Sequence, residues 1–146
     1  GSMPRKKIRI RSYSEDKHIQ DKSSLETKVS SSEGRYKTST NNFDLKRAMN
    51  IGIFDPLYGI CTPKVRVSYN RSYYKIFNTR LTIDQDIRYK KINKLGYEVL
   101  GVRDPDIIIE IKAQDSTSHE YLIRKFPFVR IRFSKYSRAI NILNLA

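Results

Sequence analysis

The chain has 146 residues, with 29 Lys and Arg against 15 Asp and Glu, so its formal net charge is +14. Hydrophobic residues make up 38% of it, enough for one core, and no apolar run approaches the roughly 20 residues of a membrane-spanning helix. The single cysteine, Cys61, excludes an intramolecular disulfide and favours a reducing, cytoplasmic setting. The excess charge predicts an anionic partner: nucleic acid, an acidic membrane surface or a polyanionic small molecule.

Residues 1–3 are typical of a cloning remnant, and 4–146 are expected to form a single domain. Period-two alternation predicts strands over 7–13, 25–29 and 34–38, the last two joined by a turn at 31–34. Asn41 and Asn42 are candidate caps for a short helix over 43–49, and 50–62 is expected to be a connecting loop.

The sequence of the second half of the chain predicts a long hairpin followed by alternating strands and helices. Residues 64–74 and 78–89 form its arms, and strict alternation puts Asp84, Asp86 and Arg88 on one face of the second arm, opposite Ile87 and Tyr89. We expect a loop around Gly96 and Gly101, a strand over 107–112, a helix from a cap in 116–118 to about Phe126, and a final strand over 128–135. The fold class is therefore mainly β (α+β), with a few short helices.

Arg and Lys recur at alternate positions of most predicted strands. For one strand alone the simpler interpretation is a solvated outer face. If the sheet closes, however, these faces line a strongly positive interior that needs a polyanion and water to be stable. Phosphate chains fit such an interior because Arg binds phosphate oxygens bidentately.

Two glutamates interrupt the cationic pattern. Glu26 and Glu110 each precede a Lys by two residues and therefore share its strand face. One interpretation makes them ligands of a hard divalent metal that bridges phosphate oxygens. The other makes each a member of a cross-strand ion pair, and the spacing favours neither.

Six segments, in this order, are similar to motifs of VTC domains, the polyphosphate polymerase domains of the triphosphate tunnel metalloenzyme or CYTH-like superfamily. They are Arg9-Ile10-Arg11-Ser12-Tyr13, Leu25-Glu26-Thr27-Lys28, Lys64-Val65-Arg66-Val67-Ser68-Tyr69-Asn70-Arg71, Arg80-Leu81-Thr82-Ile83-Asp84, Ile109-Glu110-Ile111-Lys112 and Phe133-Ser134-Lys135-Tyr136. The resemblance extends over nearly the whole chain.

The resemblance implies an antiparallel β tunnel that holds a phosphate chain while a divalent metal, Mn²⁺ or Mg²⁺, assists transfer of the terminal phosphate of ATP to polyphosphate. By position, the implied phosphate-binding residues are Arg9, Arg11, Lys28, Lys37, Tyr69, Arg71, Arg80, Lys112, Ser134 and Lys135. The implied metal ligand is Glu110, with Glu26 as the weaker candidate, and the implied catalytic residues are Glu110, Lys135 and Arg80.

The chain also departs from the family pattern. Family members begin with further strands before the Arg-x-Arg motif, whereas Arg9 lies near the start here. The chain is therefore expected to be the C-terminal portion of the family domain, with an incomplete tunnel whose activity is uncertain, and with either an open sheet or a homodimer through the unpaired strand edge.

Two of the motifs also conflict with regular strand geometry. Alternation puts Arg66 on the face opposite Tyr69 and Arg71, so the resemblance favours Arg71. Ser134 and Lys135 cannot both point inward on a regular strand, so a β-bulge or a strand end is expected there.

Two alternatives to the polymerase remain open. One is a triphosphate hydrolase on the same tunnel. The other is a non-catalytic module that binds polyphosphate, inositol phosphates or nucleic acid. Interleaved Arg and Tyr would suit a groove for single-stranded nucleic acid. Many of the aromatic residues fall on predicted apolar faces, however, which makes nucleic acid the less favoured ligand.

Overall fold

The computed structural model describes residues 4–13 and 23–145, and the expected cloning remnant at 1–3 lies outside them. Its contacts divide the chain into two compact units, Gly1–Thr62 and Pro63–Ala146. The described strands form a three-stranded, a two-stranded and a four-stranded sheet, and within this part of the chain none of the sheets closes into a barrel. The expected mainly β fold is thus confirmed, and its open antiparallel sheets are consistent with an incomplete tunnel. No helix among the described residues has the length and apolar character needed to cross a membrane.

The first unit contains an antiparallel sheet in the order β1 (Arg5–Arg11), β2 (Ser24–Ser31), β3 (Gly34–Thr40). The expected strands and the turn between the last two are confirmed. The register places Arg9 opposite Glu26, and Lys28 between Lys7 and Lys37. Cations of all three strands therefore share one face of this sheet with the Glu26 carboxylate.

The short helix of this unit begins later than its expected caps. Asp44 is the N-cap of α1 (Leu45–Asn50), because its carboxylate accepts a hydrogen bond from the backbone N–H of Arg47 at 2.9 Å. The assignment of Asn41 and Asn42 as caps was wrong.

Most of the expected loop 50–62 is a small hairpin of β4 (Ile53–Asp55) and β5 (Gly59–Cys61). The Asp55 carboxylate accepts hydrogen bonds from the N–H groups of Leu57 and Tyr58. Gly59 has a φ of 73°, which a residue without Cβ adopts freely. The loop prediction was wrong because the turn residues join two strands that are only three residues long.

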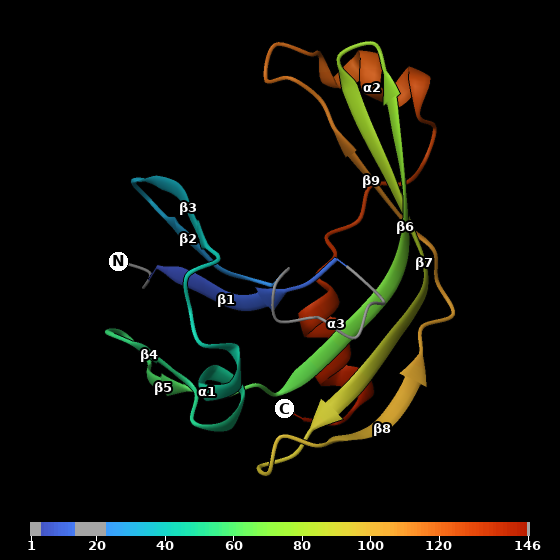
Figure 1. Cartoon of the computed structure of the whole chain (residues 1–146). Helices are drawn as coiled ribbons and strands as arrows, with labels where there is room; N and C mark the ends of the chain where they lie inside the picture. The colour runs from blue at the N-terminus through green and yellow to red at the C-terminus, as the bar shows by residue number, and fades with distance from the viewer. Residues whose placement is uncertain (1–3, 14–22, 146) are drawn as a thin grey trace. The chain divides into compact units, whose positions relative to one another are not determined.

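The second unit is built on the hairpin of β6 (Val65–Ile76) and β7 (Thr79–Ile92), as expected. β7 also pairs with β8 (Glu98–Arg103) at one end and with β9 (Ile108–Lys112) at the other. Figure 1 shows β6 and β7 as one long, curved ribbon with β8 and β9 at its opposite ends. The expected loop is confirmed at Gly96, which lies between β7 and β8, but it was wrong at Gly101, because β8 accommodates this residue beside a register shift opposite Lys90 and Lys91.

A β-bulge changes the faces of β7. Between the pairs Ser68–Arg88 and Asn70–Gln85, β6 has one residue and β7 has two. Asp86 is one of these two residues of β7, and its φ of 51° lies in the left-handed region that Asp tolerates. Asp84 and Ile87 are three residues apart, yet both are buried, so the strict alternation expected along 78–89 was wrong.

β6 keeps its alternation through the bulge. Val65, Val67 and Tyr69 pack against the buried core, and Arg71 continues on their face. Arg66 forms an ion pair with Glu98 on β8. The predicted separation of Arg66 from Arg71 is therefore confirmed without a bulge in β6.

The final segment differs most from expectation. Residues 127–134 have no strand pairing, and α3 (Lys135–Ile142) follows. The strand expected over 128–135 was wrong, because Ser134 caps a helix instead and Ala139 of that helix is completely buried against Ile87 and Tyr89. The other helix, α2 (His119–Lys125), begins at the cap Ser118 as expected.

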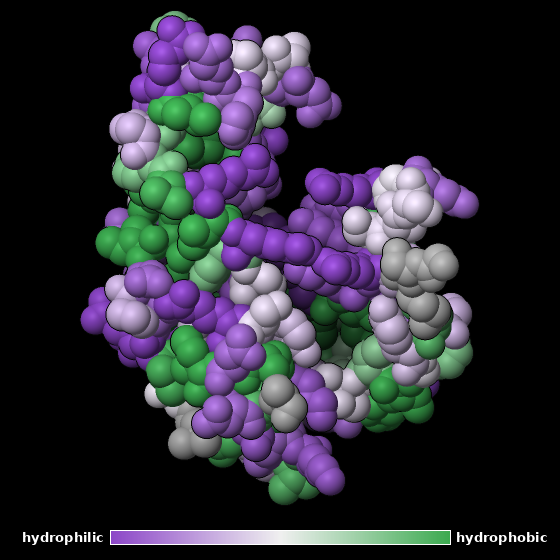
Figure 2. All heavy atoms as spheres, turned by 180° about the vertical axis from the view of Figure 1, so that it is seen from behind, coloured by the Kyte–Doolittle hydropathy of each residue, from purple (hydrophilic) through white to green (hydrophobic). Residues whose placement is uncertain are grey.

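A polar network of Tyr89, Asp104 and Arg138 lies next to this core. The Tyr89 hydroxyl donates to the buried Asp104 carboxylate at 2.6 Å, and Arg138 of α3 pairs with the same carboxylate at 2.8 Å. Burial and the hydrogen bond to Asp104 raise the pKa of Tyr89. The hydrophobic part of the core is small, and Figure 2 shows hydrophobic surface in patches interrupted by hydrophilic side chains.

Candidate functional site

One face of the β6, β7 and β9 strands carries alternating cationic and polar residues. Because β9 and β6 pair with opposite edges of β7, their residues form rows across three strands. These rows are Lys75–Arg80–Lys112, Tyr73–Thr82–Glu110 and Arg71–Asp84–Ile108. The sequence predicted four of these residues as site residues, and pairing register brings them onto one face.

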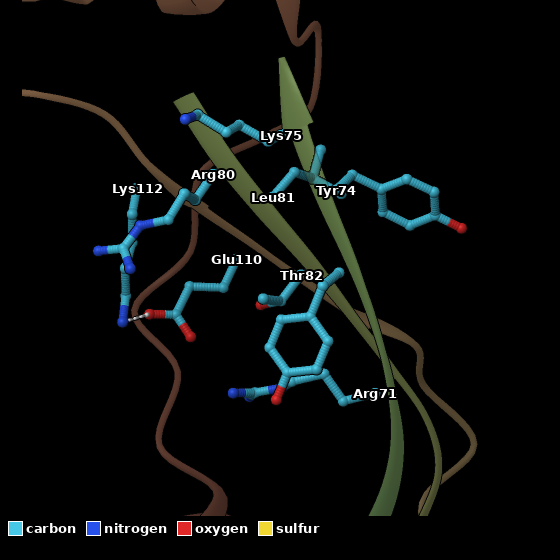
Figure 3. A pocket seen from close by; sticks show the side chains of 9 residues that line it. Arg71, Tyr74, Lys75, Arg80, Leu81, Thr82, Glu110 and Lys112 are labelled. Atoms are coloured by element: carbon cyan, nitrogen blue, oxygen red, sulfur yellow. Dashed lines mark ion pairs between the residues drawn. The ribbon is translucent and has the colours of Figure 1, made fainter. Parts of the chain in front are cut away.

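The first two rows and Arg71 line a cavity of about 310 Å³. Figure 3 shows the side chains of Arg71, Arg80, Glu110 and Lys112 projecting to the same side, whereas Tyr74 projects away from them. The Lys112 ammonium lies 3.3 Å from the Glu110 carboxylate, and both side chains are about half exposed. Within the described residues Arg80 has no ion-pair partner, so its guanidinium is available to an anion.

Asp84 is the buried residue of these rows, and it binds two cations from different elements. Arg71 of β6 donates to both of its oxygens, through Nε at 2.5 Å and Nη2 at 2.8 Å. Lys135 of α3 places Nζ 2.5 Å from Oδ2. Burial raises the pKa of Asp84, but the hydrogen bonds from Arg71 and Lys135 outweigh it and leave the pKa below its usual range. The same contact raises the pKa of Arg71.

Tyr69 lies beneath both cations. The Arg71 guanidinium is 5.0 Å from the centroid of its ring, and the Lys135 ammonium is 4.8 Å from it. The ring therefore adds cation–π attraction to the ion pairs with Asp84. These contacts assemble three of the predicted residues into one cluster together with Asp84.

Ser134 and Lys135 belong to a helix start, which removes the geometric conflict of the expected strand. The Ser134 hydroxyl accepts a hydrogen bond from the backbone N–H of Ser137 at 3.4 Å, so Ser134 is the N-cap of α3. Lys135 is the first residue of that helix and points toward Asp84. Ser134 thus positions the helix, and Lys135 contributes the charge.

The remaining predicted residues form a separate cluster in the unit Gly1–Thr62. Glu26 is buried and lies 2.5 Å from Arg9, 3.8 Å from Arg11 and 3.7 Å from Lys37. Burial raises its pKa, but the hydrogen bond and the charges of these cations outweigh burial and lower it overall. Lys28 lies on the same face, two residues along β2.

Sequence reasoning missed Asp84 as a site residue. It stood on the predicted face of Arg80, and hairpin pairing of 64–74 with 78–89 would have brought it near Arg71. Its carboxylate was not given a role, because it lacks the Lys two residues later that singled out Glu26 and Glu110. The signal available was an Asp in the middle of a strand, a position that Asp rarely occupies.

The two glutamates differ in how well they suit a divalent metal. No group of three or more His, Cys, Asp or Glu that could hold a metal occurs among residues 4–13 and 23–145. Glu110 is half exposed and has a cation, Lys112, at 3.3 Å, so a metal held chiefly by phosphate oxygens and water would meet less competition there, and its role as a ligand stays a prediction. The three cations around Glu26 compete with any metal there, so its role as a ligand stays a prediction.

Comparison with known proteins identifies a family for most of the chain. The model of the VTC domain family matches residues 50–144, which is more than half of the chain and includes the whole β6–β7–β9 face and α3. The motifs at 9–13 and 25–28 lie outside the match, so their roles stay predictions. No curated protein and no solved structure matches the chain. The chain belongs to the VTC domain family.

Proposed function

We propose that this chain is a metal-dependent phosphotransferase of the polyphosphate polymerase type, which binds a linear phosphate chain along the face of β6, β7 and β9. The observation that carries the proposal is the clustering of Arg71, Arg80 and Lys112 around one cavity. Lys135 joins Arg71 through their shared partner Asp84. Arg and Lys donors bind phosphate oxygens through charge-assisted hydrogen bonds, which are about twice as strong as neutral ones.

The proposed reaction moves one phosphoryl group. A terminal oxygen of the bound polyphosphate attacks the γ-phosphorus of ATP, and the bond from that phosphorus to the β,γ-bridging oxygen breaks. The bond electrons leave with ADP, and polyphosphate becomes one phosphate longer. No residue has to form a covalent intermediate, because catalysis of phosphoryl transfer consists mainly of alignment and charge stabilisation.

Each residue of the cluster has a distinct task in this proposal. Arg71 and Lys135 hold the phosphate chain at the end of the face near Asp84, which fixes both side chains. Arg80 and Lys112 neutralise charge on the transferred group. Glu110 would hold Mn²⁺ or Mg²⁺, and such a metal would supply positive charge that stabilises the negative charge developing on the transferred group.

The proposal is tested by incubating the protein with ATP, short-chain polyphosphate and MnCl₂. We expect one ADP for each phosphate unit added to polyphosphate, measured by ³¹P NMR and gel electrophoresis. Replacing the carboxylate in Glu110→Gln should lower the rate at least about 100-fold, whereas Glu120→Gln on the exposed surface of α2 should not change it.

The other outcomes separate the alternatives. Free phosphate in place of polymer would identify a triphosphate hydrolase. Tight binding without turnover by the unmodified protein would identify a binding module, and unchanged turnover in Glu110→Gln would contradict the role of that residue.

A further inference from the structure

A buried carboxylate is an unexpected part of a surface that binds an anion. Asp84 is only 1% exposed, and it lies on the face that carries Arg80 and Thr82. Its negative charge opposes a phosphate by simple Coulomb repulsion. Deleting that charge should therefore strengthen phosphate binding, if net charge alone decided the affinity.

The contacts of Asp84 indicate the opposite effect. Its two oxygens bind Arg71 of β6 and Lys135 of α3, which come from elements 59 residues or more apart in sequence and would otherwise repel each other. The bond through Nε and Nη2 fixes the plane of the Arg71 guanidinium. Long cationic side chains have many rotamers, so a partner that fixes them removes an ordering cost from ligand binding.

Both cations remain able to bind a ligand while they contact Asp84. Their side chains are 16% and 20% exposed, against 1% for Asp84. An Arg has five N–H donors and a Lys has three, so the bonds to Asp84 leave donors for phosphate oxygens. The carboxylate is thus shielded by the two groups that it orients.

We propose that Asp84 is a positioning residue for phosphate binding: it fixes Arg71 and Lys135 so that both donate to the same phosphate chain. This inference rests on the proposed function, because it assumes a phosphate ligand on this face. Its consequence is that Asp84→Asn weakens phosphate binding even though the substitution makes the site more positive.

The experiment is calorimetric titration of the full chain with sodium tripolyphosphate in buffer containing EDTA, so that metal binding by Glu110 does not contribute. We expect Asp84→Asn to bind at least tenfold more weakly than the unmodified protein. Asp86→Asn is the matched control, because it makes the same charge change two residues away on β7 and Asn also tolerates the φ of 51° found there. It should bind as tightly as the unmodified protein or more tightly.

A mutant cycle distinguishes positioning from a general loss of structure. In an Arg71→Gln background the guanidinium that Asp84 orients is gone, so adding Asp84→Asn should weaken binding much less than it does in the unmodified protein. The Arg71 Nε–H signal in ¹H–¹⁵N spectra should be protected from exchange in the unmodified protein and lose that protection in Asp84→Asn.

A third variant keeps the test valid if Asp84→Asn does not fold. Arg71→Lys retains the charge but cannot form the two parallel bonds to Asp84, so it should also bind tripolyphosphate more weakly. Unmodified protein that fails to bind tripolyphosphate would overturn the proposed function itself. Binding by the unmodified protein, with equal or tighter binding by Asp84→Asn or by Arg71→Lys, would overturn only the positioning role.

Discussion

Asp84 and Glu26 each place a carboxylate among cations and away from water. Removing a charge from water is costly unless opposite charges and hydrogen bonds replace the hydration. Asp84 has Arg71 and Lys135 for this purpose, and Glu26 has Arg9 at hydrogen-bond distance. The acidic residues therefore serve to organise cations, which explains how carboxylates can belong to faces suited to anions.

The lowered pKa of Asp84 predicts a specific pH dependence of stability. Because its pKa is lower in the folded protein than the value of about 3.9 in an unfolded chain, its contribution is fully present above that value and is lost as the pH falls through the folded pKa. The difference in free energy of unfolding between the unmodified protein and Asp84→Asn should thus be constant from about pH 7 to 5 and shrink below about pH 4.

Urea unfolding at a series of pH values measures this difference. The other carboxylates titrate in both proteins, so their contributions cancel in the comparison. A difference that stays constant down to pH 2.5, or that grows, would contradict an ionised Asp84 paired with Arg71 and Lys135.

At the scale of elements, α3 joins the core to the site. Ala139 fills the core beside Ile87 and Tyr89, while Lys135 at the beginning of the same helix reaches Asp84. The helix has only eight residues, too few to be stable by itself, so its N-cap and its packing must hold it in place. The position of Lys135 therefore depends on Ser134.

Ser134→Ala should lower the free energy of unfolding by about 1 kcal/mol, because it removes the acceptor for the Ser137 N–H. It should also weaken tripolyphosphate binding, because the first turn of α3 carries Lys135. Thermal unfolding and calorimetry measure the two effects, and Ser134→Asn should restore both, since Asn is also a good cap.

The matched control is Ser118→Ala at the cap of α2, where the hydroxyl accepts a hydrogen bond from Tyr121. It should cost similar stability and leave binding unchanged. Equal loss of binding in the two cap variants would indicate that the effect of Ser134→Ala comes from stability alone.

At the scale of the whole molecule, the net charge of +14 attracts any polyanion, whereas the site depends on where the charges lie. Arg80→Gln combined with Lys112→Gln changes the charge to 14 − 2 = +12, and so does Lys46→Gln combined with Lys94→Gln, at two exposed positions that do not line the cavity. We expect the first pair of substitutions to weaken tripolyphosphate binding about tenfold or more, equivalent to ~1.4 kcal/mol, and the second pair to have little effect at 0.15 M salt.

Calorimetry at several salt concentrations measures this contrast. Similar losses of affinity in both double variants would mean that binding follows net charge and not the arrangement of the face. The same measurement with single-stranded DNA of equal charge gives the nucleic-acid alternative its test: tighter binding of DNA than of polyphosphate would favour that alternative. The homodimer expected from an unpaired strand edge stays a prediction for light scattering to test.

The sequence by itself determined the features that depend on local periodicity. Alternation along 64–74 separates Arg66 from Arg71, and the side-chain period of two on a strand requires this whatever the partner strand. The cap candidates at 116–118 predicted the start of α2, which Ser118 caps, because a cap bonds only to its own first turn. The motif order also led to the family to which the chain belongs.

Only the tertiary structure decided the features that depend on distant partners. The alternation of 128–135 equally suited a strand, but residues 127–134 have no strand pairing. The chain instead forms α3 from Lys135 onward, and packing of this helix against Ile87 and Tyr89 buries Ala139. The bulge at Asp86 turns Asp84 to the face of the core, where Arg71 and Lys135 meet it. Pairing register and packing of segments far apart in sequence fix these contacts, and no local pattern contains that information.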